Sequence, residues 1–394
     1  MLRKLLGRAA VVAALALALP LSLSTAVTGN TAFKSALHDY RVVTLVDGLV
    51  QPWSIAFLPG GDILITERPG RLRVVRQGKL LPAAVEGVPR VFHSRQGGLL
   101  EVIPHPDFAS NRLVYLTYAK PGDNDPQSRT VLIRGRFDGS RLTNVEELLD
   151  ASHRGNGHYS GKIAFDGKGY LFLTLGDRQV PPAGNLEAHP AQDLTNHHGK
   201  VVRLHDDGRV PADNPFVSRA GAKPEIWSYG HRNLQGLAIH PVTGDIWTTE
   251  HGPQGGDELN RIQPGKNFGW PVVGVGVNYT TGLAIHAGTH REGMEQPVNV
   301  WVPSIGVSGA MFYTGTRFPE WRGNLFVGGM ARHKLVRLTL DGQRIAGEET
   351  LVPNMGRIRD VRQGPDGDIY LVTDDRDGKP TPILKMEPVP RPTR

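Results

Sequence analysis

The sequence predicts an all-β protein, a six-bladed β-propeller built of four-stranded antiparallel sheets. Six segments share one pattern, a turn of Gly, Asp, Asn or Pro followed by a short β-branched or aromatic run. They recur at an average interval of about 61 residues, which suits one blade with its loops. After the N-terminal region, no long stretch shows helical periodicity. The six segments begin at Leu58, His105, Phe165, His240, Phe318 and Gly364.

Further strands follow most of these segments, as in the run from Thr130 and the run from Lys334. We expect residues 40–49 and 381–388 to close the ring in one shared blade. Two β-sandwich domains are the alternative, but one shared hairpin pattern suits blades better than Greek keys. Hairpin turns then account for many of the 48 Gly and 30 Pro, and we expect residues 40–394 to form a single propeller domain after a linker over residues 27–39.

The N-terminus reads as a secretory signal peptide over residues 1–26. Arg3, Lys4 and Arg8 precede an apolar run that is too short to span a membrane, and small residues follow at the cleavage offsets. Its removal lowers the formal net charge from +7 to +4, because it carries three basic and no acidic residues. We expect a periplasmic or secreted protein with no membrane span after cleavage.

Composition excludes several kinds of chemistry. The chain has no cysteine, so it holds no disulfide, thiolate metal site or cysteine nucleophile. Lys and Arg are scattered among carboxylates, which argues against a nucleic-acid partner. Nucleotide-binding, serine-hydrolase and zinc-protease motifs are missing from the sequence.

Polar residues gather in long segments beside the predicted strands, where a rigid scaffold usually carries function. Arg357 and Arg359 are spaced to point to one side of a strand, and two guanidinium groups suit a carboxylate or planar anion. A salt-bridged pair supporting Asp360 is an equally good interpretation from spacing alone. A single histidine such as His158 is, by itself, more often structural than catalytic.

The glycine-rich segment over residues 250–258 favours close approach of backbone carbonyls to a ligand. Such oxygens, with carboxylates, suit a hard cation such as calcium, although the segment does not match an EF-hand and could be a simple turn. The adjacent His197 and His198 would face opposite ways in a strand and are a weak metal signal.

The motifs taken together resemble the soluble quinoprotein glucose and aldose sugar dehydrogenases. QGGLLEVIPHPDF, HYSGKIAFDGKGYLFLTLGD, WSYGHRNLQGLAIHP, EHGPQGGDELNRI, GKNFGWP and GRIRDVRQGPDGDIYLVTDD occur in the family's order, and the resemblance runs from about Val43 to Leu384. The resemblance implies a six-bladed propeller that binds pyrroloquinoline quinone (PQQ) with Ca²⁺. It also implies oxidation of the anomeric C1 hydroxyl of an aldose sugar to a lactone in the periplasm.

The resemblance also implies roles for individual residues. His158 matches the general base, Asp177 the carboxylate that orients it, and Arg232 the cation over the quinone oxygens. Further matches are Asn233, Arg357, Arg359 and His251 at the cofactor, Gln96 and Asp257 at the sugar, Gly252 and Pro253 as calcium ligands, and Glu258 with Phe268 at a second calcium.

Three positions depart from the glucose-oxidising branch. Gly157 replaces an acidic residue before the base, and His251 replaces a glutamine, which both favour the aldose-dehydrogenase branch. The family's cofactor lysine falls at Ala331, so Arg332 or Lys334 is the expected substitute.

Two other functions stay open from the sequence. They are a calcium-dependent propeller lactonase or hydrolase, and a non-catalytic propeller that binds carbohydrate or protein. The expected electron acceptor is a quinone or a cytochrome, and the expected assembly is a monomer or homodimer.

Overall fold

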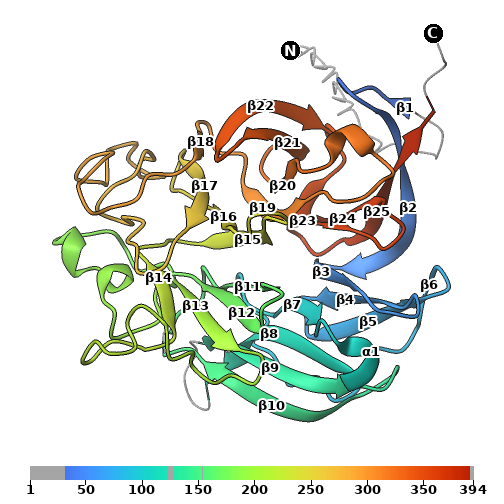
Figure 1. Ribbon diagram of the computed structural model, residues 1–394, viewed down its shortest axis with the longest axis horizontal. Coiled ribbons are helices and arrows are strands. Elements are labelled where there is room, and N and C mark those ends of the chain that lie inside the picture. Colours follow the sequence, from blue (N-terminus) through green and yellow to red (C-terminus); the bar gives the residue numbers. More distant parts are fainter. Residues whose placement is uncertain (1–31, 123–127, 153, 391–394) are drawn as a thin grey trace, which may run out of the picture.

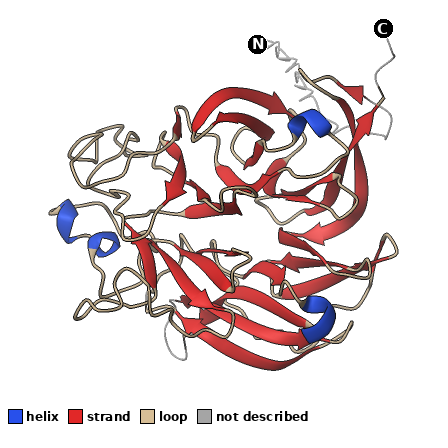
Figure 2. Ribbon diagram, in the orientation of Figure 1, coloured by secondary structure: helices blue, strands red, loops and turns tan. Residues whose placement is uncertain are grey.

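Six antiparallel sheets surround a common axis in the computed structural model (Figure 1). The structure describes residues 32–122, 128–152 and 154–390. Strands and loops make up nearly all of this part of the chain, with one short α-helix and three 3₁₀ turns (Figure 2). The predicted six-bladed propeller is confirmed, and the two-sandwich alternative is wrong. The predicted signal peptide lies outside the described residues.

Five of the blades run outward from the axis in chain order. The first two blades are β3 Pro52–Phe57, β4 Ile63–Glu67, β5 Arg71–Arg76 and β6 Lys79–Leu80, then β7 Leu99–Pro104, β8 Leu113–Pro121, β9 Ser128–Phe137 and β10 Leu142–Asp150. The next two are β11 Ser160–Phe165, β12 Tyr170–Leu175, β13 Lys200–His205 and β14 Ile226–Tyr229, then β15 Leu234–Ile239, β16 Ile246–Glu250, β17 Asp257–Ile262 and β18 Asn299–Trp301. The fifth is β19 Val307–Phe312, β20 Leu325–Gly329, β21 Lys334–Asp341 and β22 Arg344–Leu351.

The sixth blade closes the ring. It joins β23 Arg357–Gln363, β24 Ile369–Asp374 and β25 Pro380–Val389 to the N-terminal β2 Asp39–Val50. Tyr40 pairs with Pro388 and Leu49 pairs with Thr381, which confirms the predicted closure. The short β1 Ala32–Phe33 adds a fifth strand, so part of the expected linker belongs to this sheet.

The six segments recognised in the sequence each form the second strand of a blade. The strands β4, β16 and β20 are buried along their whole length, because neighbouring blades cover both faces. The outer strand β22 instead alternates between exposed and partly buried residues. The helix α1 Phe108–Asn111 and the 3₁₀ turns η1 Leu186–Ala188, η2 Pro190–Gln192 and η3 Pro319–Trp321 lie in loops. In the described part of the chain, no helix is long and apolar enough to cross a membrane.

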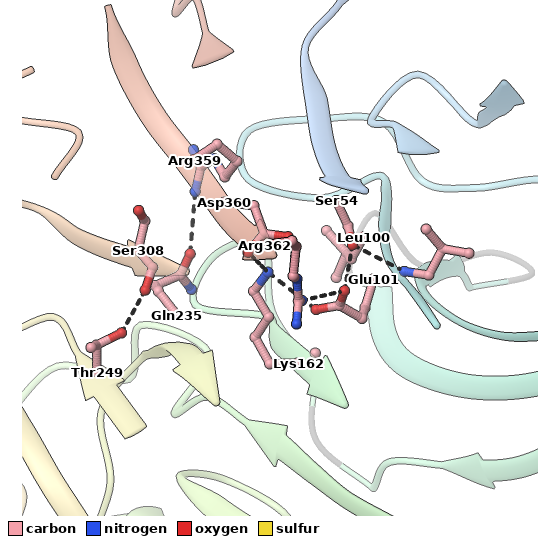
Figure 3. A network of polar contacts seen from close by, with 12 residues as sticks. Ser54, Leu100, Glu101, Lys162, Gln235, Thr249, Ser308, Arg359, Asp360 and Arg362 are labelled. Carbon is pink, nitrogen blue, oxygen red and sulfur yellow. Dashed lines mark hydrogen bonds and ion pairs between the residues drawn. The ribbon is translucent and has the colours of Figure 1, made fainter. Parts of the chain in front are cut away.

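The innermost strands pack against one another around the axis. In all six blades the pairing of the first with the second strand is interrupted by a register shift, as between Ser160 and Ile163 or between Ile358 and Asp360. Such bulges redirect side chains at strand ends. They therefore shape the axial end of every blade, where the polar residues of Figure 3 gather.

Candidate active site

A polar cavity of about 360 Å³ opens on the propeller axis, and all six blades contribute to its wall. Arg357 and Arg359 extend into it from β23, as the spacing predicts, although the bulge falls between Ile358 and Asp360. The other lining residues are Trp53, Arg68, Arg95, Gln96, Leu100, Tyr159, Ser160, Asn233, Gln235, His251, Met330, Asp374, Asp375 and Arg376.

Positive charge dominates this cavity, because five arginines face two aspartates. Arg359 donates through Nη2 to Asp374 at 2.9 Å and through Nη1 to Gln235 at 3.2 Å (Figure 3 shows the latter bond). Arg357 donates to the Met330 carbonyl at 3.3 Å. Burial and the nearby Arg359 lower the pKa of Arg357 to about 10, although Asp374 opposes the shift. Among the described residues, the Nε atoms of both arginines are buried without a hydrogen-bond partner.

The predicted base lies in a neighbouring cavity of about 210 Å³, lined by His158, Asp177, Gln179 and Arg232 among others. The His158 Nδ1 and Asp177 Oδ1 atoms are 2.6 Å apart, and both side chains are almost fully buried. His158 has φ +41° just before β11 begins, in the left-handed region that a residue with a side chain rarely adopts. Strained backbone of this kind clusters at functional sites.

The environment lowers the pKa of both residues of this pair, which leaves the histidine neutral and the aspartate ionised. Burial lowers the pKa of His158, with Arg232 and Arg178 adding to the effect, while Asp177 partly opposes it. Burial by itself would raise the pKa of Asp177, but His158 and Arg232 outweigh it and lower that pKa. The arrangement therefore favours a neutral imidazole beside an ionised carboxylate.

Asp177 fixes the imidazole tautomer. A carboxylate only accepts hydrogen bonds, so Nδ1 of the neutral ring carries the proton and Nε2 carries the lone pair. The Gln96 side chain accepts from the backbone N–H of His158 at 2.7 Å, which ties the base to the arginine-lined cavity. An imidazole in this tautomer can accept a proton from a hydroxyl group.

Three predicted residues join the two cavities. Arg232 lines the His158 cavity and donates to the carbonyl of His251 at 3.0 Å, while His251 and Asn233 line the arginine cavity. His251 donates through Nε2 to the Val307 carbonyl at 2.6 Å. Burial, assisted by Arg232 and only partly opposed by Asp257, lowers the pKa of His251 to about 4. It therefore contributes no charge near neutral pH.

The four predicted calcium ligands line one small cavity of about 20 Å³ beside Arg232. Glycine is needed at Gly252, because a Cβ there would lie 2.2 Å from the Gly256 carbonyl oxygen and 2.6 Å from that of Gly255. Burial and the nearby Glu250 raise the pKa of Glu258 to about 8. The structure thus gathers Gly252, Pro253, Glu258 and Phe268 around a space that disfavours unbalanced negative charge.

Three predicted residues do not reach these cavities. The carboxylate of Asp257 accepts from the backbone N–H groups of Gly252, Gly306 and Val307, so it braces the loops around the site. Arg332 is exposed in the turn between β20 and β21, and Lys334 pairs with Glu348 at 3.8 Å. No group of three or more His, Cys, Asp or Glu side chains that could hold a metal occurs in the described ranges.

Sequence reasoning missed several cavity residues. Arg68, Arg95 and Arg376 line the central cavity, and Trp270 and Tyr279 line the cavity that contains His158. Burial and the charge of Arg359 lower the pKa of Arg68 to about 10. Arg68 and Arg376 could have been found from their place in the sequence, because both follow the second strand of their blade.

The fold and the site define a class of protein: a propeller enzyme with a cationic axial cavity beside a buried histidine and carboxylate. A profile of the family described as Glucose / Sorbosone dehydrogenase matches residues 49–385. The chain therefore belongs to the glucose/sorbosone dehydrogenase family and is an oxidoreductase of the glucose dehydrogenase type.

Individual relatives agree with this placement. Aldose sugar dehydrogenase YliI of Escherichia coli (strain K12) is 42% identical over 367 residues, which cover 91% of this chain and 96% of the relative. Quinoprotein glucose dehydrogenase B of Acinetobacter calcoaceticus is 26% identical and covers 86% of each chain. The PQQ-bound form of aldose sugar dehydrogenase from Streptomyces coelicolor is 28% identical, with a TM-score of 0.69 over 88% of this chain and 98% of that structure.

Proposed function

We propose that this protein is a PQQ-dependent dehydrogenase that oxidises the anomeric C1 hydroxyl of aldose sugars to lactones. One observation carries the proposal. The His158 and Asp177 pair, with 2.6 Å between Nδ1 and Oδ1, lies beside an axial cavity whose charged side chains are five arginines and two aspartates.

The cavity suits the cofactor of the PQQ-bound relative. PQQ is planar and carries three carboxylates, and guanidinium groups form bidentate hydrogen bonds with carboxylates. Arg357 and Arg359 line this cavity, and their buried Nε atoms make no hydrogen bond in the described structure, although Arg357 Nε lies 3.9 Å from Asp374. We assign carboxylate binding to these two arginines and to Arg68, Arg95 and Arg376, with Asn233 and His251 on the same wall.

His158 performs the proton chemistry in this proposal. When bound, PQQ supplies a two-electron acceptor for the hydride that leaves C1. Nε2 of His158 takes the proton of the C1 hydroxyl, so that the sugar loses a hydride and a proton and becomes a lactone. Asp177 stabilises the imidazolium that forms, and Arg232 supplies positive charge beside the reacting atoms. Gln96 holds the backbone of the base.

We assign the third cavity to calcium. The carbonyl oxygens around Gly252 and Pro253 are hard ligands, and a cation near Glu258 would stabilise its ionised form. The protein is further proposed to be exported, and to pass its electrons to a quinone or a cytochrome.

Reconstitution tests the function. Purified apo-protein is mixed with PQQ and Ca²⁺, and reduction of a dye is followed with several aldoses. We expect a bound-quinone spectrum and sugar-dependent reduction. Loss of both would leave a propeller hydrolase or a carbohydrate-binding propeller, and lactone hydrolysis assays would separate these two.

His158→Ala tests the role of the base. We expect this variant to keep its PQQ affinity and to lose turnover by about 10²–10⁴-fold, because a positioned general base contributes that much. Equilibrium titration with PQQ and steady-state kinetics measure the two quantities. Wild-type turnover in this variant would remove His158 from the mechanism.

A further inference from the structure

We propose that Trp270 is a positioning residue of the sugar oxidation. Its indole N–H holds the second carboxylate oxygen of Asp177, and through Asp177 it fixes the imidazole of His158. This inference rests on the proposed function. It adds a side chain that acts on the reaction through another residue.

The hydrogen bonds of Asp177 form a chain across the cavity. Oδ1 faces Nδ1 of His158 at 2.6 Å and accepts the backbone N–H of Gln179 at 2.9 Å. Oδ2 accepts the indole N–H of Trp270 at 2.7 Å. With both oxygens engaged, the carboxylate plane cannot turn without breaking a buried hydrogen bond, and leaving a buried polar group without its partner is destabilising.

Trp270 is itself held firmly. Its backbone N–H donates to the Gly230 carbonyl at 2.8 Å, and its own carbonyl accepts from the Gln192 side chain at 2.7 Å. Trp270 is 6% exposed, and its ring meets the His286 ring edge-on, with 5.5 Å between centroids. The indole is therefore a rigid donor, as a positioning group must be.

The same ring also contacts the cation of the site. The guanidinium carbon of Arg232 lies 5.1 Å from the centroid of the Trp270 ring, within the range of a cation–π interaction. Arg232 lines the His158 cavity together with Trp270. One side chain thus holds both the carboxylate that orients the base and the cation beside the reacting atoms.

A tryptophan in this fold does not need such a bond. Trp227, Trp247 and Trp321 keep buried indole N–H groups with no hydrogen-bond partner in the described ranges. Trp321 is the closest match to Trp270, because it is fully buried and has the Arg337 guanidinium 5.9 Å above its ring. Replacing Trp321 by Phe therefore removes an indole and a cation–π contact without removing a hydrogen bond, which makes it a matched control for Trp270.

The test combines Trp270→Phe with Asp177→Ala in the full chain reconstituted with PQQ and Ca²⁺. We expect Trp270→Phe to lower kcat by about tenfold or more while KM and PQQ affinity stay within about twofold. In the Asp177→Ala background, the same change should lower kcat by less than about twofold, because its target is gone. The control variant Trp321→Phe should keep wild-type kcat.

An apo-protein measurement separates failure of this inference from failure of the proposed function. The chain has six tryptophans, and Trp270→Phe identifies the Trp270 indole N–H signal in an NMR spectrum. That signal should move in Asp177→Ala while the Trp321 signal does not.

Three results would overturn the inference. They are an unmoved Trp270 signal, wild-type kcat in Trp270→Phe, and an equal loss of kcat in both backgrounds. If Trp270→Phe does not fold, the signal that disappears in Trp270→His serves for the assignment, and its shift in Asp177→Ala decides the outcome.

Discussion

Two regions on the propeller axis treat buried charge in opposite ways. The charged cluster of Glu101, Lys162, Asp360 and Arg362 pairs every cation with a carboxylate (Figure 3). Lys162 lies 3.1 Å from Glu101 and 3.0 Å from Asp360, and Arg362 lies 2.9 Å from Glu101 and 3.0 Å from Asp360. A few residues along the same strands, the arginine-lined cavity holds an excess of cations.

The difference separates structure from function. A balanced buried cluster satisfies its own charges and gains nothing from a ligand. The cavity leaves several guanidinium groups close together, and burial, followed by the charge of Arg359, lowers the pKa of both Arg68 and Arg357. An anionic ligand would balance these charges, so the imbalance indicates where a ligand binds.

The largest expected effect comes from breaking the balanced cluster. Asp360→Ala leaves the buried Lys162 and the partly buried Arg362 with one carboxylate, and we expect a loss of about 3–5 kcal/mol in the free energy of unfolding. Urea or thermal unfolding of the apo-protein measures this. Asp341→Ala is the control, because Asp341 pairs with Arg344 where both side chains are largely exposed. Equal stability of the two variants would contradict the assigned role of the cluster.

Removing a cavity arginine should weaken ligand binding and leave stability unchanged. We expect Arg357→Ala to leave the apo-protein about as stable as the wild type, because the repulsion between Arg357 and Arg359 is lost with the side chain. PQQ affinity should fall about ten- to a hundredfold, since a charged hydrogen bond contributes about 1.5–3 kcal/mol. Fluorescence titration with PQQ checks the affinity. Unchanged affinity would show that Arg357 is structural.

Lys200 shows a third way to treat buried charge, and its expected effect is the smallest when taken per pH unit. Its ammonium group is buried and donates to the carbonyls of Ala191, Pro190 and His198. Burial lowers its pKa from 10.5 to about 7. Between these pH values the unfolded chain holds the proton and the folded chain releases it, so stability should rise with pH, by less than about 1.4 kcal/mol per pH unit.

Lys200→Met should flatten this rise, and unfolding midpoints measured between pH 7 and 10 test it. A steeper rise in the variant, or none in the wild type, would show that the carbonyl groups keep the lysine charged throughout.

The repeat of the fold could be predicted well because it is local. Each second strand, such as β12 or β24, combines a glycine turn with a short apolar run, and both signals lie within a dozen residues. The ring closure could also be predicted, because β2 and β25 are the strands left over at the two ends of the chain. The bulge in each innermost pair could not be predicted, because it depends on how blades crowd the axis.

The candidate site was predictable only in part. His158, Asp177, Arg357 and Arg359 were recognised from motifs, and the structure brings them to adjoining cavities. Arg332 was expected at the cofactor by register, yet the turn between β20 and β21 holds it in solvent. Arg68 and Trp270 were missed.

The sequence by itself determined the all-β repeat, the number of blades and the family, because turn chemistry and strand patterns act over short distances. Only the tertiary structure decided which charges are balanced and which are not. Glu101, Lys162 and Asp360 come from three different blades, and Asp177 meets the indole of Trp270 across 93 positions of sequence. Burial and pairing of a charge are set by such distant neighbours, and no local pattern records them.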